Sequence, residues 1–222
     1  MFASNFKYSA NLKCGVFNSP DSTLKLQGLT HFVRSFSRHI KYAKTPYERS
    51  NRGKRRSPRA VGNLIDSELA YLLVSDATMK DFELHPISKL IHAKLQTLGY
   101  EILAHQVFVG NVYRRLFTAA DLVTSKDDTI VIMELKTSSC KTDQDQEILD
   151  MMTVPFQKFQ NSRLNQYQLQ LCFTMRLFCL TFPQYPRVNG QLVICSYNEA
   201  EHCECDLIAF DNDIYKAVET FF

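Results

Sequence analysis

The stretch Thr118–Ser138, TAADLVTSKDDTIVIMELKTS, decides the fold. The run Thr129–Met133 is apolar and β-branched without a helical stripe, so it predicts a buried strand, and the polar sequence SKDD before it predicts a hairpin turn. Residues two apart on a strand share a face, so Glu134 and Lys136 would lie together, and the hairpin would bring Asp121 beside them. Two carboxylates and a lysine are typical of metal-dependent hydrolysis, although an ordinary hairpin with solvated carboxylates is the alternative.

Length and charge predict one domain with an extension. The chain has 222 residues and no run of 18 apolar residues, which excludes a membrane-spanning helix. Residues 1–60 hold 13 Lys and Arg against two acidic residues, a net charge of +11, whereas residues 61–222 carry −8. We therefore expect a basic N-terminal extension or arm over residues 1–60 and a catalytic domain over residues 61–222, with an anionic partner for the arm.

The most basic segment, residues 46–59, has no apolar period. It is interpreted with equal weight as an arm that contacts DNA phosphates, a nuclear-import signal or a plain linker. The first 45 residues are rich in serine and poor in acidic residues, so an organelle-targeting peptide is a further alternative. The candidate nucleic-acid-binding residues are Arg52, Lys54, Arg55, Arg56 and Arg59.

The cysteines indicate a reducing, intracellular setting. There are seven of them, an odd number without a CxxC pair, and no signal-peptide pattern precedes them. The sequence His202-Cys203-Glu204-Cys205, with Cys195 upstream, could form a soft metal site. The favoured interpretation is structural, with Cys205 entering a strand.

A helix is predicted over Val61–Val74, and it carries a carboxylate inside its apolar stripe. Glu68 lies three or four residues from apolar positions on either side, where an unpaired charge is costly to bury. We expect Glu68 to be directed at a metal site rather than to reach solvent at the rim. Asp66 lies about 200° away around the helix, so the two carboxylates are not expected to serve one site.

The remaining elements complete an α/β pattern. Helices are predicted at 29–43, 86–98, 163–180 and 214–221, and strands at 100–109, 113–123, 191–197 and 205–210. Gly110-Asn111 predicts the turn between the first two of these strands, and residues 138–161 predict a loop with a short helix. Three antiparallel strands followed by a helical crossover predict a mixed sheet flanked by helices.

This pattern resembles the PD-(D/E)XK nucleases, whose fold is restriction-endonuclease-like, and the resemblance covers 61–197. Asp121 resembles the Asp of the second strand, Glu134-Leu135-Lys136 the (D/E)XK tripeptide, and Glu68 the acidic residue of the first helix. The sequence QLQL at 168–171 is similar to the glutamine motif of the RecB-like and lambda-exonuclease-like branch. That motif implies a site role for Gln170, with Gln166 as the alternative.

The sequence departs from the family in four places. No Pro or Gly lies near Asp121, and Thr174 stands where the branch often has Tyr. Gly62 and Asp66 are similar to a Gly-x-x-x-His pattern with Asp in place of His. The cysteine pattern of the iron–sulfur members is missing, so no cluster is expected.

The resemblance implies a Mg²⁺-dependent nuclease, with Mn²⁺ able to substitute. Asp121, Glu134, the carbonyl of Leu135 and Glu68 would hold the metal, and Lys136 would orient the attacking water. The expected activity is DNA hydrolysis, and the glutamine motif favours a DNA-end-processing exonuclease that leaves 5′-phosphates. Such an enzyme would suit DNA repair or recombination.

Two alternatives remain open. One is an RNA endonuclease of the same fold, similar to cap-snatching domains, although these usually add a metal-binding His that His85 and His92 match poorly. The other is a catalytically inactive nucleic-acid-binding protein. Neither a membrane nor a particular oligomeric state is indicated.

Overall fold

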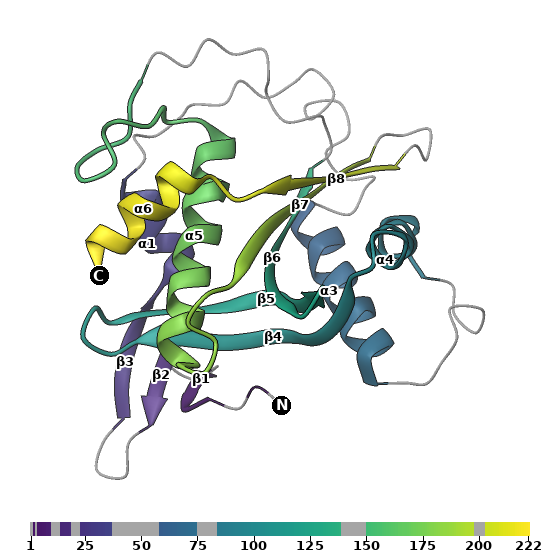
Figure 1. The fold of residues 1–222 in the computed structure, drawn as a ribbon, viewed down its shortest axis with the longest axis horizontal. Helices are drawn as coiled ribbons and strands as arrows, with labels where there is room; N and C mark the ends of the chain where they lie inside the picture. The colour runs from purple at the N-terminus through teal and green to yellow at the C-terminus, as the bar shows by residue number, and fades with distance from the viewer. Residues whose placement is uncertain are drawn as a thin grey trace.

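The computed structural model describes residues 2, 4–9, 14–18, 23–36, 58–74, 84–138, 150–197 and 203–222. Eight strands form one mixed sheet, and helices pack on both of its faces (Figure 1). The strands are β1 (Phe6–Ser9), β2 (Cys14–Asn18), β3 (Thr23–Gly28), β4 (Glu101–Asn111), β5 (Leu116–Lys126), β6 (Thr129–Ser138), β7 (Asn189–Tyr197) and β8 (Cys203–Ala209). The helices are α1 (Leu29–Ser35), α3 (Pro58–Val74), α4 (Pro86–Thr97), α5 (Arg163–Thr181) and α6 (Asn212–Phe221).

The hairpin predicted from the opening stretch is confirmed. β5 and β6 are antiparallel, and Lys126 pairs with Thr129 across the turn. The two turn residues, Asp127 and Asp128, have φ angles of 48° and 57°. Positive φ at both central positions is the conformation that matches the twist of two adjoining strands, and Asp tolerates it well.

The predicted meander and crossover are also confirmed. β4, β5 and β6 are antiparallel neighbours, and β7 pairs parallel to β6, with Leu135 opposite Val193. A parallel pair requires a crossover, and α5 lies within it. β8 then pairs antiparallel to β7, so the fold is a mixed α/β sheet flanked by helices.

Two strands share one edge of β5. The short parallel pairing of β3 involves Leu116 and Phe117, whereas β6 pairs with the later segment Leu122–Lys126. Asp121 therefore lies just before the point where the β5–β6 ladder begins. At this position its side chain, and not its backbone, can satisfy a polar group of β6.

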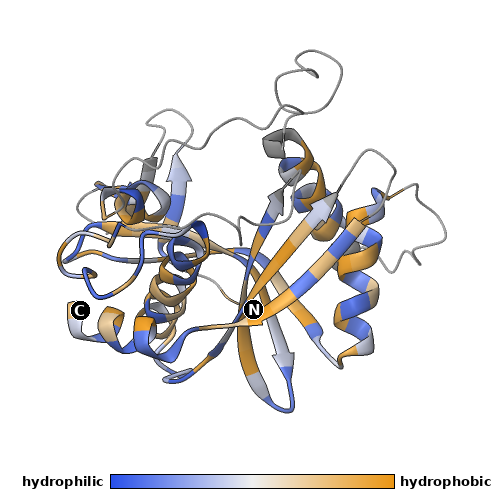
Figure 2. Ribbon diagram, turned by 90° about the horizontal axis from the view of Figure 1, so that it is seen from above, coloured by the Kyte–Doolittle hydropathy of each residue, from blue (hydrophilic) through white to orange (hydrophobic). Residues whose placement is uncertain are grey.

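The helices lie on both sides of the sheet (Figure 2) and bury two cores on its opposite faces, with Ile132 of β6 in one core and Val131 and Met133 in the other. The α5-side core includes residues of α1, α5 and α6, and the α3-side core includes residues of α3 and α4. In Figure 1, α5 crosses the middle of the sheet, while α3 and α4 lie together at one end. The face with α5 carries the candidate site.

The N-terminal region differs from the predicted arm. β1 and β2 extend the sheet, β3 joins it to β5, and α1 packs Leu29 and Val33 into the α5-side core. The boundary at residue 60 therefore does not separate residues 23–36 from the rest of the described fold. The three strands were not predicted, because short strands at a sheet edge leave a weak pattern of alternation, whereas the helix predicted at 29–43 corresponds to α1. Most of the basic segment 46–59 lies outside the described residues.

Two loop predictions need correction. The β4–β5 turn occupies Val112–Arg115 rather than Gly110-Asn111, because both of those residues still pair within the ladder. The described part of the loop predicted at 138–161, residues 150–161, has turns and a single bridge between Met151 and Gln160, and no helix. Residues 139–149 lie outside the described residues.

The described cysteines are structural in position, as expected. β8 begins at Cys203, and Cys205 lies directly opposite Cys195 on β7. Both are buried, and their thiols are hydrogen-bonded to each other. His202 lies outside the described residues, and none of the described helices is long and apolar enough to cross a membrane.

Candidate active site

Asp121 is clamped from both neighbouring strands. Its Oδ2 accepts a hydrogen bond of 2.8 Å from the backbone N–H of Leu135 on β6. Its Oδ1 accepts a longer one, 3.4 Å, from Nε2 of Gln106 on β4. Burial, followed by the nearby charge of Glu134, raises the pKa of Asp121 well above its ordinary value. The charged form of this carboxylate is therefore unfavourable until a cation compensates it.

Glu134 is the most deeply buried of the predicted site residues that the structure describes, with 2% of its surface exposed. Its Oε1 accepts hydrogen bonds of 2.5 Å from both Lys136 Nζ and Gln170 Nε2. Its Oε2 is buried and has no hydrogen-bond partner among the described residues. A buried carboxylate oxygen without a partner is costly, so this atom is a place where a further positive ligand would bind favourably.

Lys136 is held as a cation. Its Nζ also donates to Oε1 of Gln170 at 3.3 Å and lies 5.2 Å from the centre of the Tyr167 ring. Burial alone lowers the pKa of Lys136, but the charges of Glu134 and Asp121 outweigh it, and the pKa lies above its ordinary value. These contacts fit a positioned cation and do not fit a neutral base.

Of the glutamines on helix α5, Gln170 is the one whose side chain lies at the site. The helix begins at the N-cap Ser162, whose Oγ accepts from the N–H of Asn165 at 3.0 Å. Gln166, the alternative to Gln170, donates instead to Asn161 Oδ1 at 3.0 Å. Gln168 bonds to the backbone of Ala209 and Asp211, so Gln170 is the glutamine that reaches the carboxylates.

The two carboxylates of α3 have separate environments. Glu68 accepts hydrogen bonds from the N–H of His85, at 3.1–3.2 Å, and from Ser88 Oγ at 2.5 Å. It thus satisfies the N-terminus of α4, where a negative charge is favourable. Asp66 lies 3.7 Å from Nε2 of His105 on β4, and its charge contributes to the raised pKa of Asp121. Asp66, rather than Glu68, is the α3 carboxylate on the side of Asp121, and a metal-binding role for Glu68 stays a prediction.

The substitution Glu68→Ala distinguishes a helix cap from a metal ligand. Loss of the contacts to α4 is expected to lower the free energy of unfolding by about 1–2 kcal/mol. Asp66→Ala is the matched control on the same helix, and its loss should stay below about 1 kcal/mol. Urea unfolding followed by circular dichroism measures both. If Glu68→Ala kept full stability and lost divalent-ion binding, Glu68 would be a ligand after all.

The other predicted site residues are only partly described. Arg52, Lys54, Arg55 and Arg56 lie outside the described residues, and Arg59 falls within α3 without a described side chain. The carbonyl of Leu135 as a metal ligand stays a prediction. Among the described residues, no group of three or more His, Cys, Asp or Glu side chains is gathered as a metal site.

Three residues near the site were not predicted for it. Tyr167 and His105 were not among the predicted site residues, and Asp66 was not expected to share a site with Glu68. The position of Tyr167, one turn before Gln170, was a usable signal, because residues three apart on a helix are neighbours. A fourth residue, Gln106, carried no signal in the sequence.

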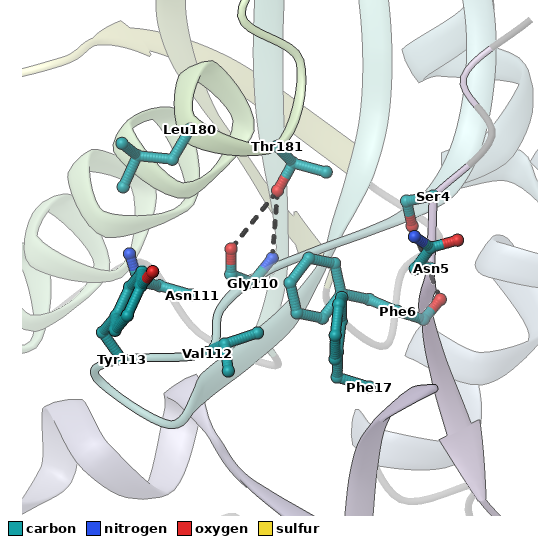
Figure 3. A pocket seen from close by; sticks show the side chains of 10 residues that line it. All are labelled: Ser4, Asn5, Phe6, Phe17, Gly110, Asn111, Val112, Tyr113, Leu180 and Thr181. Carbon is teal, nitrogen blue, oxygen red and sulfur yellow. Dashed lines mark hydrogen bonds between the residues drawn. The ribbon is translucent and has the colours of Figure 1, made fainter. Parts of the chain in front are cut away.

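A cavity of about 510 Å³ lies at the other end of α5 (Figure 3). Phe6, Phe17, Leu180, Thr181 and the β4–β5 turn line it. Thr181 Oγ1 accepts from the N–H of Gly110 at 3.2 Å and so ties α5 to the end of β4. Thr181 comes 11 residues after Gln170, about 16 Å along the helix, so this cavity is separate from the carboxylate site.

Comparisons with known proteins give no family assignment. No protein-family model matches the chain, and no curated protein matches it. Solved structures that are similar at a low level include the following two. The crystal structure of SSO0001 is 14% identical, covers 87% of this chain and 71% of its own, and has a TM-score of 0.34. An alkaline exonuclease, LHK-Exo, from Laribacter hongkongensis is 13% identical, covers 88% of this chain and 85% of its own, and has a TM-score of 0.36. Similarity at this level carries no argument about function, which depends on the site.

Proposed function

We propose that this chain is a divalent-metal-dependent nuclease that hydrolyses phosphodiester bonds of DNA. The observation that carries the proposal is Oε2 of Glu134, which is buried without a hydrogen-bond partner in the described part of the chain and lies beside a second carboxylate of raised pKa. The contacts of Lys136 and Gln170 to the same carboxylate support it. This is the set of groups that hydrolysis of an anionic ester requires: a place for a cation, and a lysine held close by.

The donor set fits Mg²⁺, or Mn²⁺ in its place. Asp121 and Glu134 would hold the ion, and hard carboxylate oxygens suit it. Mg²⁺ usually retains several waters and takes one or two protein carboxylates together with substrate phosphate oxygens, so two carboxylates are sufficient. When bound, it would lower the pKa of a water and neutralise charge on the scissile phosphate.

The other residues act through position and charge. Lys136, kept cationic by the carboxylates, would hold the attacking water and balance the negative charge that develops on the phosphate. Gln170 donates to Glu134 and accepts from Lys136, so it bridges the two side chains and holds them against α5. Tyr167 places its ring beside the Lys136 ammonium and limits its motion.

The finer assignments follow from the sequence resemblance. They are a DNA-end-processing exonuclease that leaves 5′-phosphates, with the basic segment at 52–59 adding phosphate affinity that decreases with salt. The alternatives remain an RNA endonuclease of the same fold and a nucleic-acid-binding protein without turnover.

Digestion of labelled nucleic acids tests the proposal. With Mg²⁺, the wild type should degrade linear DNA, and Lys136→Ala should reduce the rate by about 10²–10³-fold, because one charge-stabilising donor is removed. Linear, circular and nicked DNA separate exonuclease from endonuclease, and a matched RNA tests the RNA alternative. Gln166→Ala, which changes the neighbouring glutamine outside the carboxylate network, is the control. No cleavage of any substrate with either ion, at unimpaired binding, would favour the non-catalytic alternative.

A further inference from the structure

Gln106 has a backbone conformation that is unusual for its place in the fold. Among the described residues, four residues other than glycine have positive φ. Arg115, Asp127 and Asp128 lie in the two hairpin turns, where such angles are common. Gln106, with φ 51°, lies in the middle of β4. A residue with a long side chain adopts the left-handed region there only if its surroundings require it.

At this position the side chains of β4 and β5 change the face of the sheet to which they point. On β4, Ala104 and Val107 both pack into the α5-side core although they are three residues apart. On β5, Ala120 and Val123 do the same. In a regular strand, residues an odd number apart point to opposite faces. Both strands are therefore irregular between these pairs, and the irregular part of β4 contains Gln106.

The irregular segments meet at Asp121. The β4–β5 ladder pairs His105 with Leu122 and Val107 with Ala120, so Gln106 stands across from Asp121. The Gln106 side chain donates to Oδ1 at 3.4 Å, and the Leu135 N–H donates to Oδ2 at 2.8 Å. One carboxylate is thus held by two strands through its two oxygens.

We infer that Gln106 is a positioning residue that fixes the Asp121 carboxylate for a divalent cation. This inference deepens the proposed function and rests on it. The left-handed backbone of Gln106 turns its side chain onto Asp121, whereas a regular extended backbone would direct that side chain elsewhere. The strained φ angle of Gln106 is kept because the contact to Asp121 requires it, and strain of this kind is common next to binding sites.

A purely structural role would be filled better by glycine. Glycine adopts positive φ without steric penalty, so it would produce the same change of face with less strain. It lacks the amide that reaches Asp121. For Gln106→Gly, a positioning role therefore predicts weaker ion binding, whereas a purely structural role predicts maintained stability with unchanged ion binding.

The test measures ion binding and unfolding on the full chain. Titration calorimetry with Mg²⁺ and Mn²⁺ should give a dissociation constant about 10–100-fold weaker for Gln106→Gly, the usual effect of removing a partner of a metal ligand. The denaturation midpoint of this variant should be equal to or above that of the wild type. Gln106→Asn tolerates the left-handed backbone but is one methylene too short, so it should lose affinity similarly.

Arg115→Gly is the matched control. Arg115 has almost the same φ, 52°, but lies in the β4–β5 turn, so its replacement relieves similar strain without changing a contact to Asp121. Its denaturation midpoint should also be maintained or raised, and its ion affinity should equal that of the wild type.

The outcomes separate this inference from the proposed function. Unchanged ion affinity in both Gln106 variants would overturn the positioning role while leaving the nuclease proposal standing. If the wild type binds the ions but cleaves no nucleic acid, and both Gln106 variants bind the ions more weakly, the positioning role is supported and the nuclease proposal is overturned. A wild type that binds neither ion would overturn both.

Discussion

Replacing Asp121 with asparagine is expected to abolish hydrolysis and, at the same time, to stabilise the metal-free protein. Asparagine keeps an oxygen that can accept from the Leu135 N–H, so the clamp to β6 survives. It lacks the negative charge that would hold the cation, so the rate under the proposed function should decrease by a factor on the order of 10³ or more. The expected gain in stability has a separate cause.

The pKa of Asp121 gives the sign of that gain. Burial and the neighbouring Glu134 raise this pKa well above the ordinary value of 3.8, so the folded chain holds the proton more tightly than the unfolded chain. The stability of the metal-free protein therefore decreases as the pH rises above 3.8 toward the raised pKa of the folded state. Asparagine has no charge to bury, so the Asp121→Asn variant should lack this decrease.

Thermal unfolding with and without Mg²⁺ separates the two effects at neutral pH. Without the ion, the midpoint of Asp121→Asn should exceed that of the wild type. Added Mg²⁺ should raise the wild-type midpoint, because an ion that binds only the folded chain stabilises it, and should leave the variant unchanged. A variant that is less stable than the wild type without metal, or that still gains stability from Mg²⁺, would contradict this account of the site.

Replacing Phe173 with alanine is expected to cause the largest loss of stability among single changes in the α5-side core. Phe173 is fully buried, and its ring lies 5.4–5.9 Å from four others, which come from α1, the segment before α5, and the C-terminus. These rings are Phe32, Phe156, Phe221 and Phe222. Truncation of such a residue costs about 3–5 kcal/mol, a large share of the roughly 5–15 kcal/mol that stabilises a domain.

Leu180→Ala provides the comparison on the same helix. Leu180 is 39% exposed, so its truncation should change the free energy of unfolding by less than about 1 kcal/mol. Guanidinium unfolding of both variants gives the difference. If Phe173→Ala lowered the free energy of unfolding by less than Leu180→Ala, the rings around Phe173 would not form the common core of α1, α5 and α6.

The charged part of the site could be predicted because it is local in sequence. Asp121, Glu134 and Lys136 lie on one hairpin, where the alternation of strand positions and the polar turn determine which side chains meet. Gln170 could be proposed only with a resemblance to a family, because periodicity places Gln166 and Gln170 near the same face. The hydrogen bond of Gln166 to Asn161 distinguishes them, and it depends on the path of the loop before α5.

The parts that were not predicted depended on tertiary contacts. The carboxylate inside the apolar stripe of α3 predicted a metal ligand, and the contacts of Glu68 to the N-terminus of α4 were not foreseen. The sequence gives no direction for those contacts, since they depend on how α3 and α4 pack. Likewise, β1, β2 and β3 pair with one another but join the rest of the sheet through the pairing of β3 with the distant β5, which local propensity does not report.

The sequence separations across the site also describe the order in which its contacts can form. The contact from Leu135 to Asp121 spans 14 residues, whereas the contact from Gln170 to Glu134 spans 36. The entropy of closing a loop grows with its length, so the hairpin closes at the smaller cost, by about 1 kcal/mol or less. Hairpin closure brings the two carboxylates and the lysine together. Helix α5 then docks onto charges that are already in place, and its own contribution is the neutral amide of Gln170, which bonds to both Glu134 and Lys136.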